Sequence, residues 1–113
     1  MPISPAEAPH YVWGAECDGW RLCDAPGLSV IEERMPPGTA EARHVHDQAR
    51  QVFRVLSGTL TMHGSDGTVQ VAAGQALEVA LGLAYQARND GTEDVRFLVI
   101  SAPSTRADRR DMP

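Results

Sequence analysis

A chain of 113 residues can bury a hydrophobic core without disulfide bonds or a structural metal, so we expect a single domain over residues 1–113. Hydrophobic residues make up 42% of the chain, and ten glycines with eight prolines indicate many turns between short elements. The formal net charge of −5 excludes nucleic acid and anionic membrane surfaces as favoured partners, because both repel an acidic protein. A small-molecule ligand or a protein partner fits this composition better.

Several residue types limit the chemistry further. All ten basic residues are arginine, which excludes Schiff-base formation on a lysine amine. Cys17 and Cys23 have no histidine or second cysteine pair at zinc-finger spacing, so we interpret them as reduced structural thiols. The N-terminal segment lacks the basic and apolar regions of a secretory signal, and no apolar run approaches membrane-spanning length. We therefore expect a cytoplasmic protein.

Short strands are predicted along most of the chain. The N-terminal segment carries Trp13 and Trp20, and burying them requires an edge strand or a cover over one end of the fold. A strand predicted over 28–35 ends at Pro36-Pro37-Gly38. Further short apolar segments, each closed by a turn signal, predict strands over 43–46, 52–56, 59–63, 69–72, 76–79, 84–88 and 95–101. This spacing, with no competing helical periodicity, predicts an all-β sandwich or barrel.

Three features refine this prediction. Asp66-Gly67 is the clearest hairpin signal, because glycine accepts the positive φ of a tight turn. Apolar side chains that line or fill a barrel are expected at Phe53, Val55, Leu60 and Met62. The polar tail over 103–113 has no apolar period, so we expect it to lie loosely outside a core barrel of about 20–102, or to pack on a neighbouring subunit.

Two histidines separated by one residue, His44 and His46, are the best functional lead. Residues i and i+2 of a strand point to the same face, so the two imidazoles would form two adjacent corners of a metal site. The alternative is a pair that only hydrogen-bonds within a polar interior. The remaining histidines are weaker candidates: His63 lies beside a turn and is expected to be exposed, and His10 lies in a flexible segment.

The pair falls within a longer pattern that resembles both signature motifs of the cupin superfamily, over about half the chain. The first motif requires glycine, His-x-His, glutamate and glycine, and this sequence has Gly38, His44, His46, Gln51 and Gly58 at those positions. The second requires glycine, Pro-x-Gly, histidine and asparagine, and the sequence has Gly74, Ala80, Gly82, Tyr85 and Asn89. Every interval fits, while glutamine, alanine and tyrosine replace the glutamate, the proline and the second-motif histidine.

The resemblance implies an all-β double-stranded β-helix, or jelly roll, that holds a metal in the barrel and pairs as a homodimer. The implied ligands in this chain are His44, His46, Gln51 and Tyr85. Gln51 keeps a carbonyl oxygen but loses the carboxylate charge, and Tyr85 offers a phenol of pKa ~10 that suits a strongly Lewis-acidic ion such as ferric iron. This mixed N/O set accommodates one transition metal ion, which could be iron, zinc, nickel, manganese or copper.

Alternatives stay open for Tyr85 and for the function. Tyr85 could act as a general acid or base beside a metal-bound ligand, or its ring could fill the metal position and hydrogen-bond to His44 or His46. The first functional hypothesis is a small metal-dependent enzyme of dioxygenase, isomerase or lyase type acting on a small organic acid. The second is a non-catalytic cupin that binds a small ligand with a degenerate or empty metal site. A structural dimer with a vestigial cavity is a third.

Overall fold

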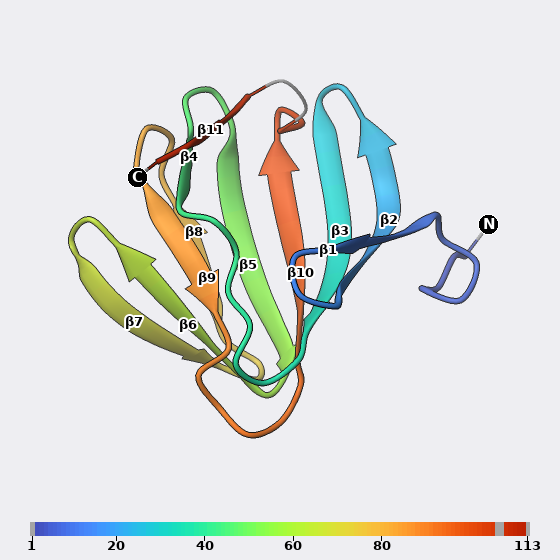
Figure 1. Ribbon diagram of the computed structural model, residues 1–113. Helices are drawn as coiled ribbons and strands as arrows, with labels where there is room; N and C mark the ends of the chain where they lie inside the picture. Colours follow the sequence, from blue (N-terminus) through green and yellow to red (C-terminus); the bar gives the residue numbers. More distant parts are fainter. Residues whose placement is uncertain (1, 106–107, 113) are drawn as a thin grey trace.

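The computed structural model describes residues 2–105 and 108–112, and these form two facing antiparallel β-sheets (Figure 1). In chain order the strands are β1 His10–Trp13, β2 Cys17–Ala25, β3 Leu28–Met35, β4 His44–His46, β5 Arg50–Ser57, β6 Thr59–Gly64, β7 Gly67–Ala72, β8 Ala76–Val79, β9 Tyr85–Arg88, β10 Val95–Ala102 and β11 Arg109–Asp111. All eight strands predicted from residue 28 to residue 101 are present, each within two residues of its expected bounds.

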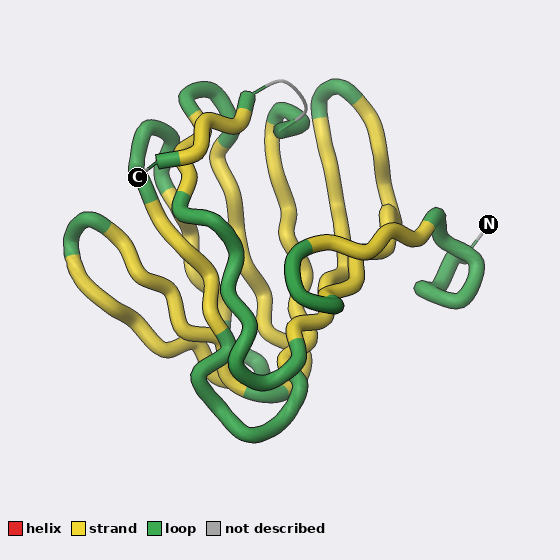
Figure 2. The backbone as a smooth tube through the Cα atoms, viewed as in Figure 1, coloured by secondary structure: helices red, strands yellow, loops and turns green. Residues whose placement is uncertain are grey.

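The two sheets have the strand orders β1-β2-β3-β10-β5-β8 and β11-β4-β9-β6-β7. The chain passes repeatedly from one sheet to the other, and Figure 2 shows strands joined only by turns and loops in the described residues. This arrangement confirms the predicted all-β double-stranded β-helix. None of the described residues belongs to a helix long and apolar enough to cross a membrane.

The core lies between the sheets and follows the alternation of the strands. In β10 every second side chain from Val95 to Ser101 is buried, because successive strand residues point to opposite faces. Phe53, Val55, Leu60 and Met62 are at most 3% exposed, as predicted. Cys17 is buried in the same core, and both Cys17 and Cys23 are free thiols.

Both flanking segments of the chain extend the sheets. The N-terminal segment forms β1 and β2, with β1 at the edge of the larger sheet, which confirms the predicted edge strand. His10 therefore lies in a regular strand, where Nε2 is 2.8 Å from Asp18 Oδ1, and the expected flexible segment is wrong.

The polar tail also differs from expectation, although its residues 106–107 and 113 lie outside the described part of the chain. Residues 109–111 form β11, which pairs with the histidine-bearing strand β4. Backbone pairing and ion pairs hold this strand. In one of these ion pairs Arg110 Nε lies 2.7 Å from Asp47 Oδ2. Such interactions leave no apolar period in the sequence, which is why the strand was missed.

The turn between β5 and β6 depends on Gly58. Its φ is +76°, and a Cβ built there would lie 2.5 Å from the backbone oxygen of Asp94. Gly58→Ala is therefore expected to lower the free energy of unfolding by about 1 kcal/mol or more, measured by chemical denaturation. Gly27→Ala is the control, because Gly27 has open space around it and should tolerate the methyl group. Equal stability of the two variants would contradict this account of the turn.

Candidate functional site

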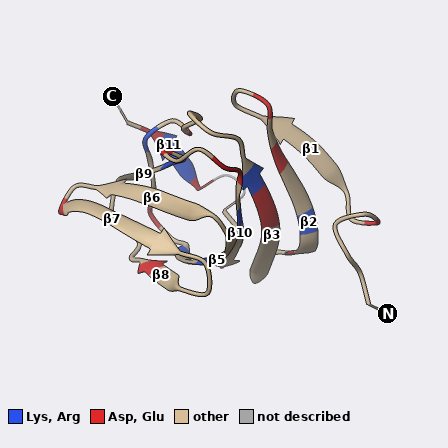
Figure 3. Cartoon of the chain, turned by 90° about the horizontal axis from the view of Figure 1, so that it is seen from below, with Lys and Arg blue, Asp and Glu red and all other residues tan. Residues whose placement is uncertain are grey.

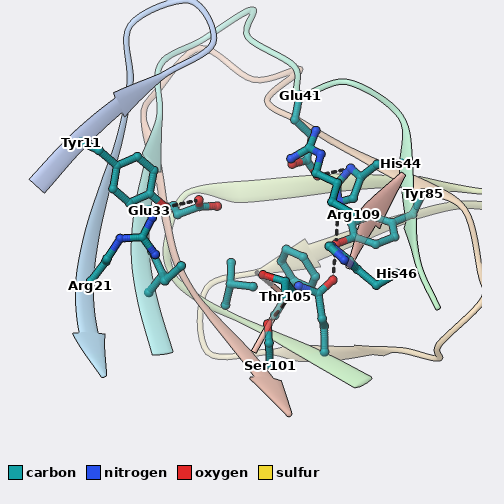
Figure 4. A pocket seen from close by; sticks show the side chains of 14 residues that line it. Tyr11, Arg21, Glu33, Glu41, His44, His46, Tyr85, Ser101, Thr105 and Arg109 are labelled. Atoms are coloured by element: carbon teal, nitrogen blue, oxygen red, sulfur yellow. Dashed lines mark hydrogen bonds and ion pairs between the residues drawn. The ribbon is translucent and has the colours of Figure 1, made fainter. Parts of the chain in front are cut away.

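A cavity of about 260 Å³ opens between the two sheets and is lined by all four residues predicted as ligands, His44, His46, Gln51 and Tyr85. This volume suits a small organic molecule. Figure 4 shows His44, His46 and Tyr85 gathered on one side of the cavity, with Tyr11, Arg21 and Glu33 on the other. The cavity therefore has two polar walls of different composition.

The histidine wall is built by strand register. His44 on β4 is paired directly with Tyr85 on β9, so the two side chains lie on the same face, and Tyr85 Oη is 3.1 Å from His44 Nε2. In the opposite sheet Gln51 on β5 is paired with Ser101 on β10, and Gln51 Nε2 donates to Ser101 Oγ at 3.0 Å. The hydroxyl of Tyr85 also hydrogen-bonds to Gln51 Oε1 and so links the two sheets.

The protonation of His44 follows from its neighbours. Burial lowers the pKa of His44 to about 4, so the ring is neutral at pH 7. Its Nδ1 lies 2.9 Å from the carbonyl oxygen of Ala42, which can only accept a hydrogen bond. The single ring proton therefore belongs on Nδ1, and Nε2 presents a lone pair to the cavity.

Tyr85 consequently has one hydroxyl proton and two acceptors, His44 Nε2 and Gln51 Oε1. Burial raises the pKa of Tyr85 well above 10, so the hydroxyl keeps that proton at neutral pH. In this orientation one lone pair is left without a hydrogen and is available to a cation or a proton. Rotating the Gln51 amide by 180° removes the deficit, because its NH₂ would then donate to Tyr85 and its oxygen would accept from Ser101.

His46 has a different environment. Burial lowers the pKa of His46, and Nδ1 has no hydrogen-bond partner among the described residues. The nearest carboxylate oxygen belongs to Asp108, 3.9 Å from Nδ1. The rings of His44 and His46 meet edge to face with centroids 4.9 Å apart, as expected for residues i and i+2 of one strand.

The second wall comes from a row of residues across three strands. Tyr11 on β1 is paired with Gly19 on β2, which is paired with Glu33 on β3. A Cβ built at Gly19 would lie 2.3 Å from the Tyr11 ring, so the glycine lets the ring cross β2. Tyr11 then donates a long hydrogen bond of 3.4 Å to Glu33, and the guanidinium of Arg21 lies 4.7 Å from the Tyr11 ring centroid.

Two carboxyl groups in the cavity have raised pKa values. Burial, with repulsion from Glu41, raises the pKa of Glu33 to about 8, and burial raises the pKa of Glu41 to about 7. Glu41 Oε1 accepts a hydrogen bond from the backbone N–H of Ala87 at 3.1 Å and lies 4.0 Å from His44 Nδ1. Figure 3 shows acidic residues in red on β3 and basic residues in blue on β11. One of the basic residues of β11, Arg109, lines the cavity.

Sequence reasoning missed the residues of the second wall together with Glu41 and Arg109. Alternation along 28–35 could have placed Glu33 on an inward face, but nothing in the sequence indicated that Tyr11 or Arg109 would reach it. His63 does not line the cavity, and its Nδ1 lies 2.9 Å from the Thr68 hydroxyl. The motif residue Asn89 is structural: its buried amide donates to the carbonyl oxygens of Met35 and Glu93, both at 2.8 Å.

Residues 31–101 match the family model of the cupin domain, and the chain belongs to the cupin family. The matched region contains the histidine wall and leaves β1, β2 and β11 outside it. No protein of curated function matches the sequence.

Solved structures with the same fold include several named as enzymes. A sugar phosphate isomerase of the cupin superfamily from Silicibacter pomeroyi is 18% identical, with a TM-score of 0.81, over 92% of this chain and 76% of that one. A predicted oxalate decarboxylase from Thermotoga maritima is 18% identical, with a TM-score of 0.84, over 92% and 100% of the two chains. The polyketide cyclase RemF from Streptomyces resistomycificus is 19% identical, with a TM-score of 0.84, over 100% and 85%. At these identities the likeness establishes the fold alone.

Proposed function

We propose that this cupin is a small enzyme that acts on an oxygen-rich organic acid in the cavity, with a transition metal ion held at the histidine wall. The observation that carries the proposal is the group of lone pairs on that wall: a neutral His44 with Nε2 facing the cavity, and one hydroxyl proton on Tyr85 for two acceptors. Such a deficit of protons favours a cation.

The residues present fit a metal with mixed nitrogen and oxygen ligands. His44 and His46 would supply imidazole nitrogen, while Gln51 and Tyr85 would supply oxygen, a set that iron, zinc, nickel, manganese and copper all accept. A bound ion would polarise a carbonyl or carboxylate oxygen of the substrate. Ser101 holds the Gln51 amide in place at 3.0 Å. In the alternative in which a substrate oxygen takes the place of Tyr85 in the ligand set, Tyr85 keeps its hydroxyl proton and can donate it to the substrate.

The charged groups that line the rest of the cavity support a polar substrate. Arg21 and Arg109 offer guanidinium donors for a carboxylate, and Glu33 and Glu41 offer groups that exchange protons near neutral pH. Solved structures of the same fold are named as a sugar phosphate isomerase, a predicted oxalate decarboxylase and a polyketide cyclase. We therefore favour isomerase, lyase or dioxygenase chemistry on a compact oxygenated acid.

Metal analysis tests this proposal directly. Protein purified without a chelator or a histidine tag, then supplied with each of the five metals in turn and dialysed, is expected to retain about one equivalent of one of them. A His44→Ala/His46→Ala variant should lose it, because both nitrogen ligands are gone. His63→Ala is the control, since His63 lies outside the cavity. Less than a tenth of an equivalent of every metal would rule out the metal-dependent enzyme.

A second candidate function is a metal-free module that binds a small ligand without turnover. The rotated orientation of the Gln51 amide favours this function, because the chain of groups from His44 through Tyr85 and Gln51 to Ser101 is then fully hydrogen-bonded without an ion. In that case the metal titration fails while the cavity remains intact. The free thiols of Cys17 and Cys23 support a reducing compartment, so we place either function in the cytoplasm, as a homodimer typical of small cupins.

A further inference from the structure

Asp108, the residue immediately before β11, is anchored beside His46 through its carboxylate. Three consecutive backbone N–H groups, of Asp47, Gln48 and Ala49, donate to Asp108 at N···O distances of 3.1, 3.2 and 2.9 Å. Successive N–H groups of this kind form a fixed cradle for an anion. Arg110 adds a two-point contact to Asp47 at 2.7 and 2.9 Å. The carboxylate of Asp108 is therefore held in place by the loop that immediately follows β4.

One oxygen of this carboxylate faces the unsatisfied nitrogen of His46. Asp108 Oδ2 lies 3.9 Å from His46 Nδ1, and the side chains are 9% and 6% exposed. Nδ1 has no hydrogen-bond partner among the described residues. A carboxylate at this separation attracts an N–H and repels a lone pair, so it favours the tautomer with the proton on Nδ1. The lone pair is then on Nε2.

We propose that Asp108 is a positioning residue for His46, which fixes the tautomer of the ring so that Nε2 carries the lone pair available to the cavity. The Ala42 carbonyl, 2.9 Å from Nδ1, fixes His44 in the same tautomer. The two imidazoles thus act as a matched pair, one set by the backbone oxygen of Ala42 and the other by Asp108, which lies 62 positions further along the chain and acts on the ring through its backbone and its carboxylate. The use of both lone pairs on a metal rests on the proposed function, whereas the tautomer does not. Partners of metal-binding histidines commonly work in this way.

The tautomer can be read in the metal-free protein by long-range ¹H–¹⁵N NMR of the imidazole nitrogens. Wild-type His46 is expected to carry its proton on Nδ1, and Asp108→Asn is expected to shift the ring toward a mixture of tautomers. Asp47→Asn is the matched control, because it removes the contact to Arg110 and a second carboxylate charge near His46 while leaving Asp108 in place. A wild-type His46 protonated on Nε2 would overturn the inference without any variant.

The second measurement is Zn²⁺ affinity by competition with a chelator. Asp108→Asn is expected to weaken Zn²⁺ binding about 10- to 100-fold, and Asp47→Asn less than about 3-fold. Equal affinities for Asp108→Asn and wild type, or an unchanged His46 tautomer, would overturn the positioning role. If wild-type protein binds no metal, the proposed metal-dependent function fails separately, and the tautomer measurement alone decides the role of Asp108.

Discussion

Replacing Gln51 by glutamate and Tyr85 by histidine together is expected to raise the affinity for Zn²⁺ by about 100- to 1,000-fold. Gln51 is 4% exposed and Tyr85 3%, so both new groups would be buried on the wall that carries His44 and His46. The double variant adds a negative charge and a third imidazole, which changes a weak mixed set into the two-motif cupin set. Competition with a chelator measures the gain.

The single variants indicate where the gain comes from. Gln51→Glu alone should lower the free energy of unfolding of the metal-free protein, because a buried carboxylate replaces an amide that donates to Ser101. Adding Zn²⁺ should reverse that loss. Tyr85→His alone should raise Zn²⁺ affinity less than the double variant does. If the double variant binds no more tightly than wild type, these four positions do not converge on one ion.

Stability is expected to fall by about 2 kcal/mol as pH rises from 6.5 to 8, largely because of Glu33. The folded-state pKa of Glu33 is raised from 4.5 to about 8, so the folded protein holds a proton that the unfolded chain has already released. A raised carboxyl pKa therefore contributes stability at pH values below 4.5 that is lost as pH rises toward 8. Glu41, with its pKa raised to about 7, acts in the same direction.

The histidines act with the opposite sign at lower pH. The pKa of His44 is lowered from 6.5 to about 4, so the unfolded chain binds the proton first and stability is lost as pH falls below 6.5. Between pH 4.5 and 6.5 the two effects oppose each other, and above pH 6.5 each histidine adds back only about 0.4 kcal/mol as the unfolded chain loses its last imidazole protons. Unfolding in denaturant at pH 6.5, 7, 7.5 and 8 therefore measures mainly the effect of the carboxyl groups.

Glu33→Gln should flatten most of this decline, because the amide does not titrate. Glu32→Gln is the matched control, since Glu32 is the neighbouring strand residue and does not line the cavity. A wild-type protein as stable at pH 8 as at pH 6.5 would show that the Glu33 carboxyl is not held protonated by its surroundings.

The fold was predictable because its signals are local. Strand alternation and turn glycines placed eight strands within two residues, and the motif intervals identified the histidine wall that register later brought together. Pairing of β4 with β9 makes His44 and Tyr85 neighbours although 40 residues separate them in the chain. The spacing of the two motifs predicted this pairing, because the number of residues between the motif positions fixes which strand residues face each other in the barrel.

The second wall and the C-terminal strand were not predictable in the same way. Tyr11 reaches Glu33 only because β2 offers a glycine between them, which is a matter of packing across three strands. Asp108 meets His46 through backbone N–H groups that every sequence possesses. Neither contact leaves a period or a motif, so only the folded structure places these side chains.

The crossing of Tyr11 over Gly19 brings the hairpin of β1 and β2 into one side of the cavity. The hairpin of β1 and β2 lies outside the residues that match the family, yet it supplies two of the groups that a ligand would meet. Exchanging that hairpin for another of equal length would change the shape and charge offered to a ligand while leaving the imidazole pair untouched. Ligand choice in this protein can therefore change through its first strands, provided that the exchanged hairpin keeps the pairing with β3 and the buried side chain at position 17.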